Sequence, residues 1–291
     1  MKKTLVCALA LLLIAGAAGT YFFLKNGIEK QVRPEIDRIA QDMRSQGVNA
    51  SYKDMSVNVL ARSVSLSDVT LDIDGQTMTI DQAVIFASPD YDREGRFQLR
   101  GMNLGRENLA ALSRDPQSLP EHVKGDMEID YALDPAASRV NIRRLSMGVR
   151  ELGLLDLSLD VEGVPENAFQ GDLTALLMGY PSLALRSLRL RYEDAGFVRI
   201  ALADSAKEEG ITPNEALKKA QDELDAQIED AKAKNQPFAV EFLKAMKGFL
   251  NSQKGFEITA APEKPVSAAS LLGLADPKEA IKLLGLRAES L

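Results

Sequence analysis

The chain has little of the chemistry on which enzymes rely. It contains one cysteine, Cys7, one histidine, His122, and no tryptophan. A lone cysteine excludes an intrachain disulfide and a cluster of thiolate ligands, and a lone histidine excludes mechanisms that need two imidazoles. A glycine-rich phosphate loop of the GxxxxGK[ST] type is also missing. We therefore predict a protein that is not an enzyme and has no cofactor. A membrane-anchored hydrolase is disfavoured because no nucleophile, base and orienting group can be assembled.

Positive charge is in short supply as well. Lysine and arginine number 35 against 42 aspartates and glutamates, which gives a formal net charge of −7. Nucleic-acid binding depends on basic faces that displace counterions from phosphates, so the balance argues against a nucleic-acid partner. Aromatic residues make up only 5% of the chain, but 45% of the 291 residues are hydrophobic. That is enough for one large core or two modest ones.

The N-terminus carries a long uncharged run. After Lys2 and Lys3, the twenty residues 5–24 contain no charge, and at ~1.5 Å per residue they span ~30 Å, the thickness of the hydrocarbon core of a bilayer. The aromatic segment 21–24 extends the run before Lys25 closes it. We predict an uncleaved transmembrane anchor over residues 1–24. The alternative is a cleaved secretory signal, because residues 15–17 (Ala-Gly-Ala) offer small residues at the spacing of a cleavage site.

A short apolar pattern with spacings of two, three and two occurs four times. Its members are Val64, Leu66, Val69 and Leu71; Phe97, Leu99, Met102 and Leu104; Val140, Ile142, Leu145 and Met147; Leu183, Leu185, Leu188 and Leu190. A spacing of two keeps side chains on one face of a strand, and a step of three switches the face unless an extra residue bulges out. Each copy therefore predicts a bent strand. We take these sixteen residues as the apolar surface that lines either a lipid groove or a core.

The order of patterns predicts an α+β fold. Residues 25–47 have helical spacing and form a neck, residues 48–192 alternate as antiparallel strands, and residues 193–255 contain a helical hairpin. Thr212, Pro213 and Glu215 form a strong helix start for that hairpin. Residues 256–291 supply a last strand and two short helices. The prediction is thus a long curved, mainly antiparallel sheet with the hairpin packed on or beside it.

One segment has part of a calcium-binding pattern. Asp90, Asp92 and Glu94 place oxygen ligands at alternate positions, as in the first half of an EF-hand loop. The glutamate required at the twelfth position is replaced by Gly101, and the flanks have the alternation of strands. We therefore predict a polar hairpin turn and no metal site, and keep these three residues as the candidate ligands if calcium binds.

The segment that follows the anchor and neck, residues 52–71 (YKDMSVNVLARSVSLSDVTL), resembles the start of AsmA-like proteins of the bacterial envelope. The resemblance covers about the first third of the chain. It implies an inner-membrane helix that carries a curved sheet in the periplasm, with links to outer-membrane integrity and phospholipid traffic. We expect a single-pass protein whose bulk is periplasmic and whose partners are the membrane, phospholipid and envelope proteins. The alternative function is a membrane-tethered scaffold or adaptor whose helices cover the sheet face.

Overall fold

The structure is a computed structural model that describes most of the chain beyond the N-terminus. The described residues are 33–34, 36–38, 40–41, 44, 48–58, 60–73, 76–86, 93–105, 122–170, 178–274 and 276–291. The predicted anchor, its alternative cleavage site, and Asp90 and Asp92 lie outside these residues. Within the described part, no helix is long and apolar enough to cross a membrane.

The chain divides into two compact units. The first unit comprises Met1–Gly105 and His122–Ala132, and the second comprises Arg106–Glu121 and Leu133–Leu291. Each contains an antiparallel sheet, and the long helices of the second unit follow its first three strands in the sequence. The predicted α+β class, with antiparallel strands and C-terminal helices, is confirmed.

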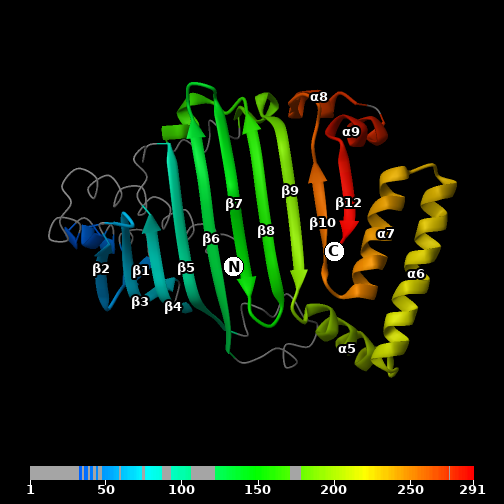
Figure 1. Ribbon diagram of the computed structural model, residues 1–291, viewed down its shortest axis with the longest axis horizontal. Helices are drawn as coiled ribbons and strands as arrows, with labels where there is room; N and C mark the ends of the chain where they lie inside the picture. Colours follow the sequence, from blue (N-terminus) through cyan, green and yellow to red (C-terminus); the bar gives the residue numbers. More distant parts are fainter. Residues whose placement is uncertain are drawn as a thin grey trace. The chain divides into compact units, whose positions relative to one another are not determined.

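The sheet of the first unit is a meander with a broken edge. Its strands are β1 (Val48–Ser51), β2 (Asp54–Asn58), β3 (Ser63–Ile73), β4 (Gln76–Phe86), β5 (Glu94–Gly105) and β6 (His122–Asp134). Both β1 and β2 pair with β3, one after the other, and β3 to β6 then pair in sequence order (Figure 1). Ile73 lies opposite Gln76, so β3 and β4 pair as antiparallel neighbours up to their adjoining ends.

The core of the first unit contains fully buried side chains. Leu71 and Ile80 are 1% and 0% exposed. Residues of the neck are helical at the described positions between 33 and 44, and Ile36 packs with Met55 and Val64 in one buried cluster. The neck therefore covers part of the apolar sheet face in this unit.

The described part of the second unit contains six strands and two 3₁₀ turns. The strands are β7 (Arg139–Val149), β8 (Gly153–Glu162), β9 (Ala184–Asp194), β10 (Gly255–Ala260), β11 (Val266–Ser267) and β12 (Leu286–Ser290), and the turns are η3 (Glu166–Gln170) and η4 (Tyr180–Ser182). β7, β8, β9, β10 and β12 pair antiparallel in that order, and β11 pairs with the start of β9. The strand expected after residue 255 is β10, but it is not the last strand, because β12 returns beside it.

The described residues of the second unit form five helices. They are α5 (Phe197–Glu209), α6 (Pro213–Ala233), α7 (Pro237–Ser252), α8 (Ala268–Leu272) and α9 (Pro277–Leu284). The helix start predicted at Thr212 is confirmed: its Oγ1 accepts from the Glu215 amide at 3.3 Å, and Glu215 accepts from the Thr212 amide at 2.8 Å. The sequence analysis missed α5, whose apolar residues do not form a clear stripe.

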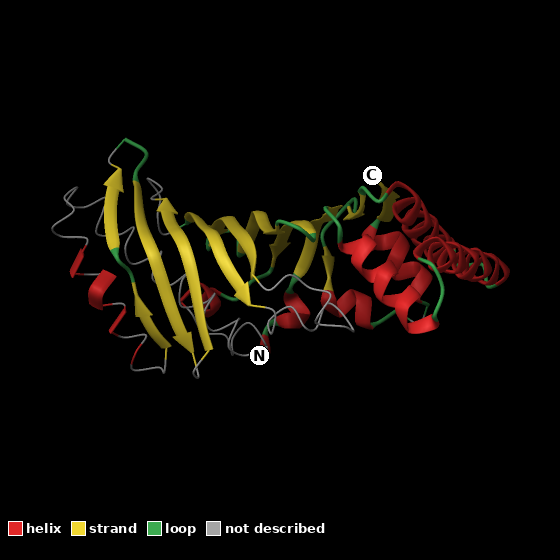
Figure 2. Ribbon diagram, turned by 90° about the horizontal axis from the view of Figure 1, so that it is seen from below, coloured by secondary structure: helices red, strands yellow, loops and turns green. Residues whose placement is uncertain are grey.

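Helix α7 closes the open edge of the second sheet. It packs against β12, and α6 lies on its far side (Figures 1 and 2). Glu241 of α7 accepts a hydrogen bond from the amide of Ala288 at 2.8 Å. A Cβ on Gly248 would lie 2.4 Å from Oγ of Ser290, so the helix needs a glycine to approach this closely. An edge strand that would otherwise offer unpaired amides is thus covered.

The step of three in the repeated pattern coincides with a backbone irregularity in every copy. In the first two copies the residues within this step include Asp68 and Gly101, whose φ angles of 48° and 64° are left-handed. In the third copy the register shifts between Ile142 and Leu145. In the fourth, Arg186 has no opposite residue in β8. Where the register shifts, the extra residue keeps the apolar side chains on one face, as the spacing predicts.

Candidate functional site

The candidate site is one face of the sheet in the second unit, called here the apolar sheet face. Strand alternation places the apolar residues of β7 to β10 on one side of this sheet. Three cross-strand rows define the face: Met147, Leu155, Tyr192 and Phe256; Leu145, Leu157, Leu190 and Ile258; Ile142, Leu159, Leu188 and Ala260. The rows run without interruption across four strands, so apolar side chains touch side by side over the whole width.

This face is only partly covered. Met147 and Leu155 lie directly opposite each other, and each is 38% exposed. Leu157 and Leu190 in the next row are half-buried. By contrast, Leu71, which holds the same place in the first copy of the pattern as Met147 in the third and Leu190 in the fourth, is 1% exposed. Contiguous apolar surface of this kind is typical of places where a lipid, a membrane or a protein binds.

An aromatic cluster marks the covered end of the apolar sheet face. Phe249 of α7 lies over Tyr192 and Phe256, with ring centroids 5.8 Å and 5.5 Å away. In Figure 1, α7 lies beside β12 and α6 lies beyond α7, so β7 and β8 do not lie beneath these helices, and α7 contacts the sheet at β10 and β12. The C-terminal helices therefore cover part of the face and leave the Met147 and Leu155 end accessible.

Tyr192 joins the aromatic cluster to the turn after β7. Its hydroxyl lies 2.9 Å from the Leu152 carbonyl oxygen and 2.9 Å from Oδ1 of Asp194. Burial, followed by the hydrogen bond to Asp194, raises the pKa of Tyr192. Asp194 also accepts from the amides of Gly196 and Val198 and so caps the start of α5. The phenol thus fixes this corner of the face rather than serving as an acid or base.

The sixteen predicted residues divide between the units. Val64, Val69, Leu71, Phe97, Leu99 and Met102 are buried in the first unit, and Leu66 is half-buried. Leu104 is in β5, but its side chain lies outside the described residues. In the second unit, Val140, Ile142, Leu145, Leu183, Leu185, Leu188 and Leu190 are half-buried and Met147 is exposed. The first two copies are thus mainly core positions of the first unit, and the last two lie on the partly exposed face of the second.

Several members of the apolar sheet face were not among the predicted site residues. Leu155, Leu157 and Leu159 of β8 alternate at a spacing of two without the step of three, so the repeated pattern did not include them. Phe256 and Ile258 come from a strand more than sixty residues further along the chain. The alternation itself was the available signal, but strand order was needed to place the five side chains together.

The opposite face of the same sheet is charged. Arg139 binds Asp160 through Nε at 2.7 Å, and Arg186 binds Glu162 at 2.6 Å. Arg189 donates to Glu257 at 2.7 Å. This bond raises the pKa of Arg189 and lowers that of the Glu257 carboxyl. Most exposed ion pairs of this kind contribute little to the stability of a fold, so their main effect is to keep this face of the sheet polar and hydrated.

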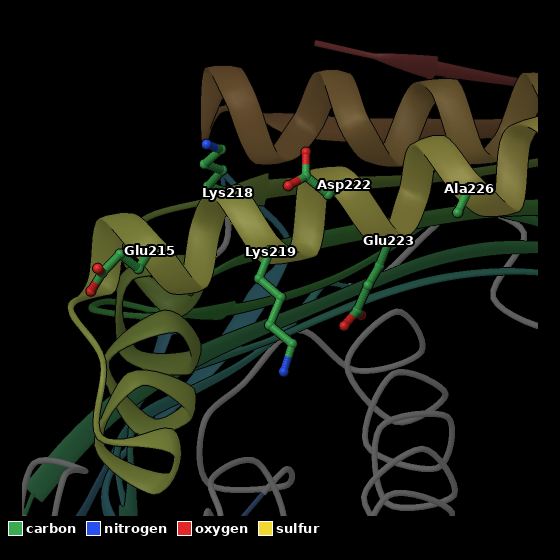
Figure 3. A pocket seen from close by; sticks show the side chains of 6 residues that line it. All are labelled: Glu215, Lys218, Lys219, Asp222, Glu223 and Ala226. Atoms are coloured by element: carbon green, nitrogen blue, oxygen red, sulfur yellow. The ribbon is translucent and has the colours of Figure 1, made fainter.

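Two surface hollows contain no convergent chemistry. One is lined by Glu215, Lys218, Lys219, Asp222, Glu223 and Ala226. Figure 3 shows that all six come from α6, with Lys219 and Glu223 pointing to the same side. Mixed charges on one helix are typical of a solvated face.

The other hollow lies in the first unit between Asp37 and Lys53, where Asp37 accepts from the hydroxyl of Tyr52 at 2.6 Å. Burial, followed by this bond, raises the pKa of Tyr52 to about 12.

The described residues contain no group of three or more histidine, cysteine, aspartate or glutamate side chains that could hold a metal ion. Glu94, one of the three candidate calcium ligands, is the first residue of β5 and lies opposite Ala132. His122 begins β6, and its side chain lies outside the described residues.

A family model described as an uncharacterized protein matches residues 146–290. The match starts inside β7 and runs through β12, so it covers most of the sheet that carries the apolar sheet face. Among curated proteins, none matches the chain.

Proposed function

We propose that the protein is a non-enzymatic cell-envelope protein that binds lipid acyl chains on the apolar sheet face of the second unit. The observation that carries the proposal is the exposure of Met147 and Leu155, which form an opposed pair at the uncovered end of three apolar rows. An acyl chain is unbranched and apolar, and it gains most when it lies along such rows. The charged opposite face supports a single binding side.

The proposal includes the arrangement that the AsmA-like resemblance implies. Residues 1–24 anchor the chain in the bacterial inner membrane, and one long curved sheet extends from the anchor into the periplasm. The partner is phospholipid, and the task is lipid handling or maintenance of the outer membrane. In this arrangement the first unit, whose apolar pattern residues are mostly buried, is a structural base. The second unit provides the binding surface.

The direct test is photocrosslinking of the full chain in liposomes. The liposomes contain a phospholipid with a photoreactive group near the end of one acyl chain, and the labelled peptides are identified by mass spectrometry. We expect label on peptides that contain residues 147–159. Label confined to residues 1–32 would contradict the proposal, because it would show that lipid meets only the predicted anchor.

A matched pair of variants sharpens this test. Leu155→Glu places a carboxylate on the apolar sheet face at a site that is 38% exposed, and Leu60→Glu makes the same change in a turn of the first unit at a site that is 99% exposed. A carboxylate beside an acyl chain loses its water, so Leu155→Glu should reduce labelling of β7 and β8 about tenfold or more. Leu60→Glu should leave labelling unchanged. Equal labelling of both variants would show that lipid does not use this face.

The second candidate function is a tethered adaptor, favoured by a separate apolar group near one end of the second sheet. Met178 is 80%, Tyr180 46% and Leu272 67% exposed. The turn η4 and helix α8 that carry two of them are neighbours, since the amide of Ala268 donates to the carbonyl of Leu183 at 2.8 Å. In this case a photoreactive residue at position 272 would crosslink to one envelope protein in cells, while the photoreactive lipid would leave β7 and β8 unlabelled.

A further inference from the structure

The charged face of the second sheet contains a hollow of about 370 Å³ that is rich in arginine. It is lined by Arg143, Arg144, Asp156, Leu157, Ser158, Arg189, Arg191 and Glu193. Its size is at the lower end of the range for small-molecule sites. The lining contains four arginines and two carboxylates, and Glu257 pairs with Arg189 as a third, so the local excess is still positive although the chain carries a net charge of −7.

A β-bulge creates this excess. The register between β7 and β8 pairs Ile142 with Leu159 and Leu145 with Leu157. Two arginines, Arg143 and Arg144, therefore stand opposite the single residue Ser158, where regular pairing would place one. On its other side Ser158 lies opposite Arg189 of β9. A short side chain is thus flanked by arginines from both neighbouring strands, which leaves room above it.

The guanidinium groups remain accessible although they have acidic partners. Side chains of Arg144 and Arg189 are 50% and 52% exposed, whereas their partners Asp156 and Glu257 are 25% and 20% exposed. The carboxylates thus lie deeper, and the guanidinium groups face outward. Each guanidinium has five N–H donors, more than one carboxylate accepts. Arg189 contacts Glu257 through Nη2 alone.

Arg191 provides a second, independent indication of a missing acceptor. Its Nη2 binds Glu193 at 2.6 Å, but its Nε is buried and has no hydrogen-bond partner among the residues that the structure describes. A buried donor without an acceptor is costly, and an anion or a water in the hollow would relieve that cost. Planar guanidinium groups pair well with the oxygen atoms of phosphate.

We infer that this arginine-lined hollow binds a phosphate group. The ligand is a soluble phosphate compound or the headgroup of a lipid, which share the chemistry that the arginines recognise. Apart from Leu157, the site is lined by residues of the face opposite the apolar sheet face. It is therefore independent of the proposed acyl-chain surface, and either one can fail alone.

The test uses the full chain in non-ionic detergent micelles and isothermal titration calorimetry with two probes. Inorganic pyrophosphate represents soluble ligands, and a six-carbon-chain phosphatidic acid represents lipid headgroups. Saturable binding of pyrophosphate alone supports a soluble ligand, and tighter binding of the short-chain lipid supports a headgroup. Binding should weaken as salt is raised, because the hollow is open to solvent. Absence of saturable binding of both probes would overturn the inference.

Variants locate the binding on the hollow. Arg189→Gln should weaken binding tenfold or more. The matched control is Arg186→Gln, on the same strand and face but outside the hollow, where the arginine pairs with Glu162; it should bind like the parent. Equal weakening in both would indicate diffuse attraction to positive charge and would overturn the site. Ser158→Glu provides a second variant that keeps all four arginines. It should abolish binding by placing a carboxylate at the floor of the hollow, and unchanged binding would refute the assignment.

Discussion

The two units place the same apolar pattern in opposite environments. In the first unit Leu71 and Leu99 are 1% and 2% exposed, and in the second Met147 is 38% exposed and Leu190 is half-buried. The difference does not come from the strands, which are antiparallel and irregular at the step of three in both units. It comes from what lies over them. The spacing of apolar residues encodes which face they share, and other parts of the chain decide whether that face is covered.

The covering elements show how this difference arises. In the first unit Ile36 of the neck packs on Met55 and Val64. In the second unit the helical hairpin buries several of its own apolar residues, among them Ala216, Ile228 and Ala245. Helix α7 reaches the sheet at β10 and β12, so a face built to the same pattern stays partly open.

The largest expected effect compares a core leucine with a face leucine. Leu71→Ala removes a side chain that is 1% exposed and leaves a cavity, so it should lower the free energy of unfolding by ~2–5 kcal/mol. Leu155→Ala, at a site that is 38% exposed, should cost roughly 1 kcal/mol. Urea unfolding of the full chain in detergent measures both. Equal costs would mean that the apolar sheet face is a filled core, as the scaffold function requires.

A second comparison uses two glycines with similar left-handed φ angles, 64° for Gly101 and 69° for Gly210. A Cβ at Gly101 would lie 2.1 Å from Oδ2 of Asp81, whose carboxylate pairs with Lys124, whereas a Cβ at Gly210 would meet nothing within 4 Å. Gly101→Ala should cost roughly 2–3 kcal/mol, from backbone strain and a clash. Gly210→Ala should cost about 1 kcal/mol, from strain alone. The shift in thermal midpoint of each variant measures this, and a smaller shift for Gly101→Ala would contradict the packed bulge.

Local signals predicted most of the fold. The residues Thr212, Pro213 and Glu215 fixed the start of α6, because capping is decided within four residues. Alternation predicted β7 to β9, and the step of three predicted the bulge at Ile142 and Leu145. These features depend on neighbours in the sequence, so the sequence contains the information needed to recognise them.

Features that depend on distant segments were not predicted. Strand β12 pairs with β10 although 25 residues separate Ala260 from Leu286, and its own apolar residues are too few to reveal it. The arginine-lined hollow needs the register of β7, β8 and β9 to bring Arg143 and Arg189 to the two sides of Ser158. Coverage of the apolar pattern likewise depends on where the helices pack, and the spacing of the apolar residues does not indicate where that is.

Alkaline unfolding separates the two units by their half-buried, hydrogen-bonded tyrosines Tyr52 and Tyr192. The folded-state pKa of Tyr192 in the second unit is raised, and that of Tyr52 in the first is raised to about 12. Below pH 10 both phenols are neutral in folded and unfolded chains, so stability is fully present. Above pH 10 the unfolded phenol ionises first and stability falls, by up to ~1.4 kcal/mol per pH unit for each proton. Tyr192→Phe should flatten this fall in the second unit between pH 10 and 11, and Tyr52→Phe in the first. Unchanged slopes in both variants would show that neither phenol is held neutral.

The smallest effect concerns the start of α6 and asks whether the hairpin unfolds with its sheet. Thr212→Ala removes the hydroxyl that caps the Glu215 amide and should lower the free energy of unfolding by about 1 kcal/mol. Thr212→Ser keeps the hydroxyl and is the matched control. Since α7 packs against β12 and covers the amide of Ala288, loss of the cap should shift the transition of the second unit and leave that of the first unchanged. Hydrogen exchange resolves the two, because amides of β9 and of β4 report on different units. Faster exchange in both α6 and α7, with β9 unaffected, would show that the hairpin opens separately, and the covered end of the apolar sheet face would then be accessible whenever the hairpin is open.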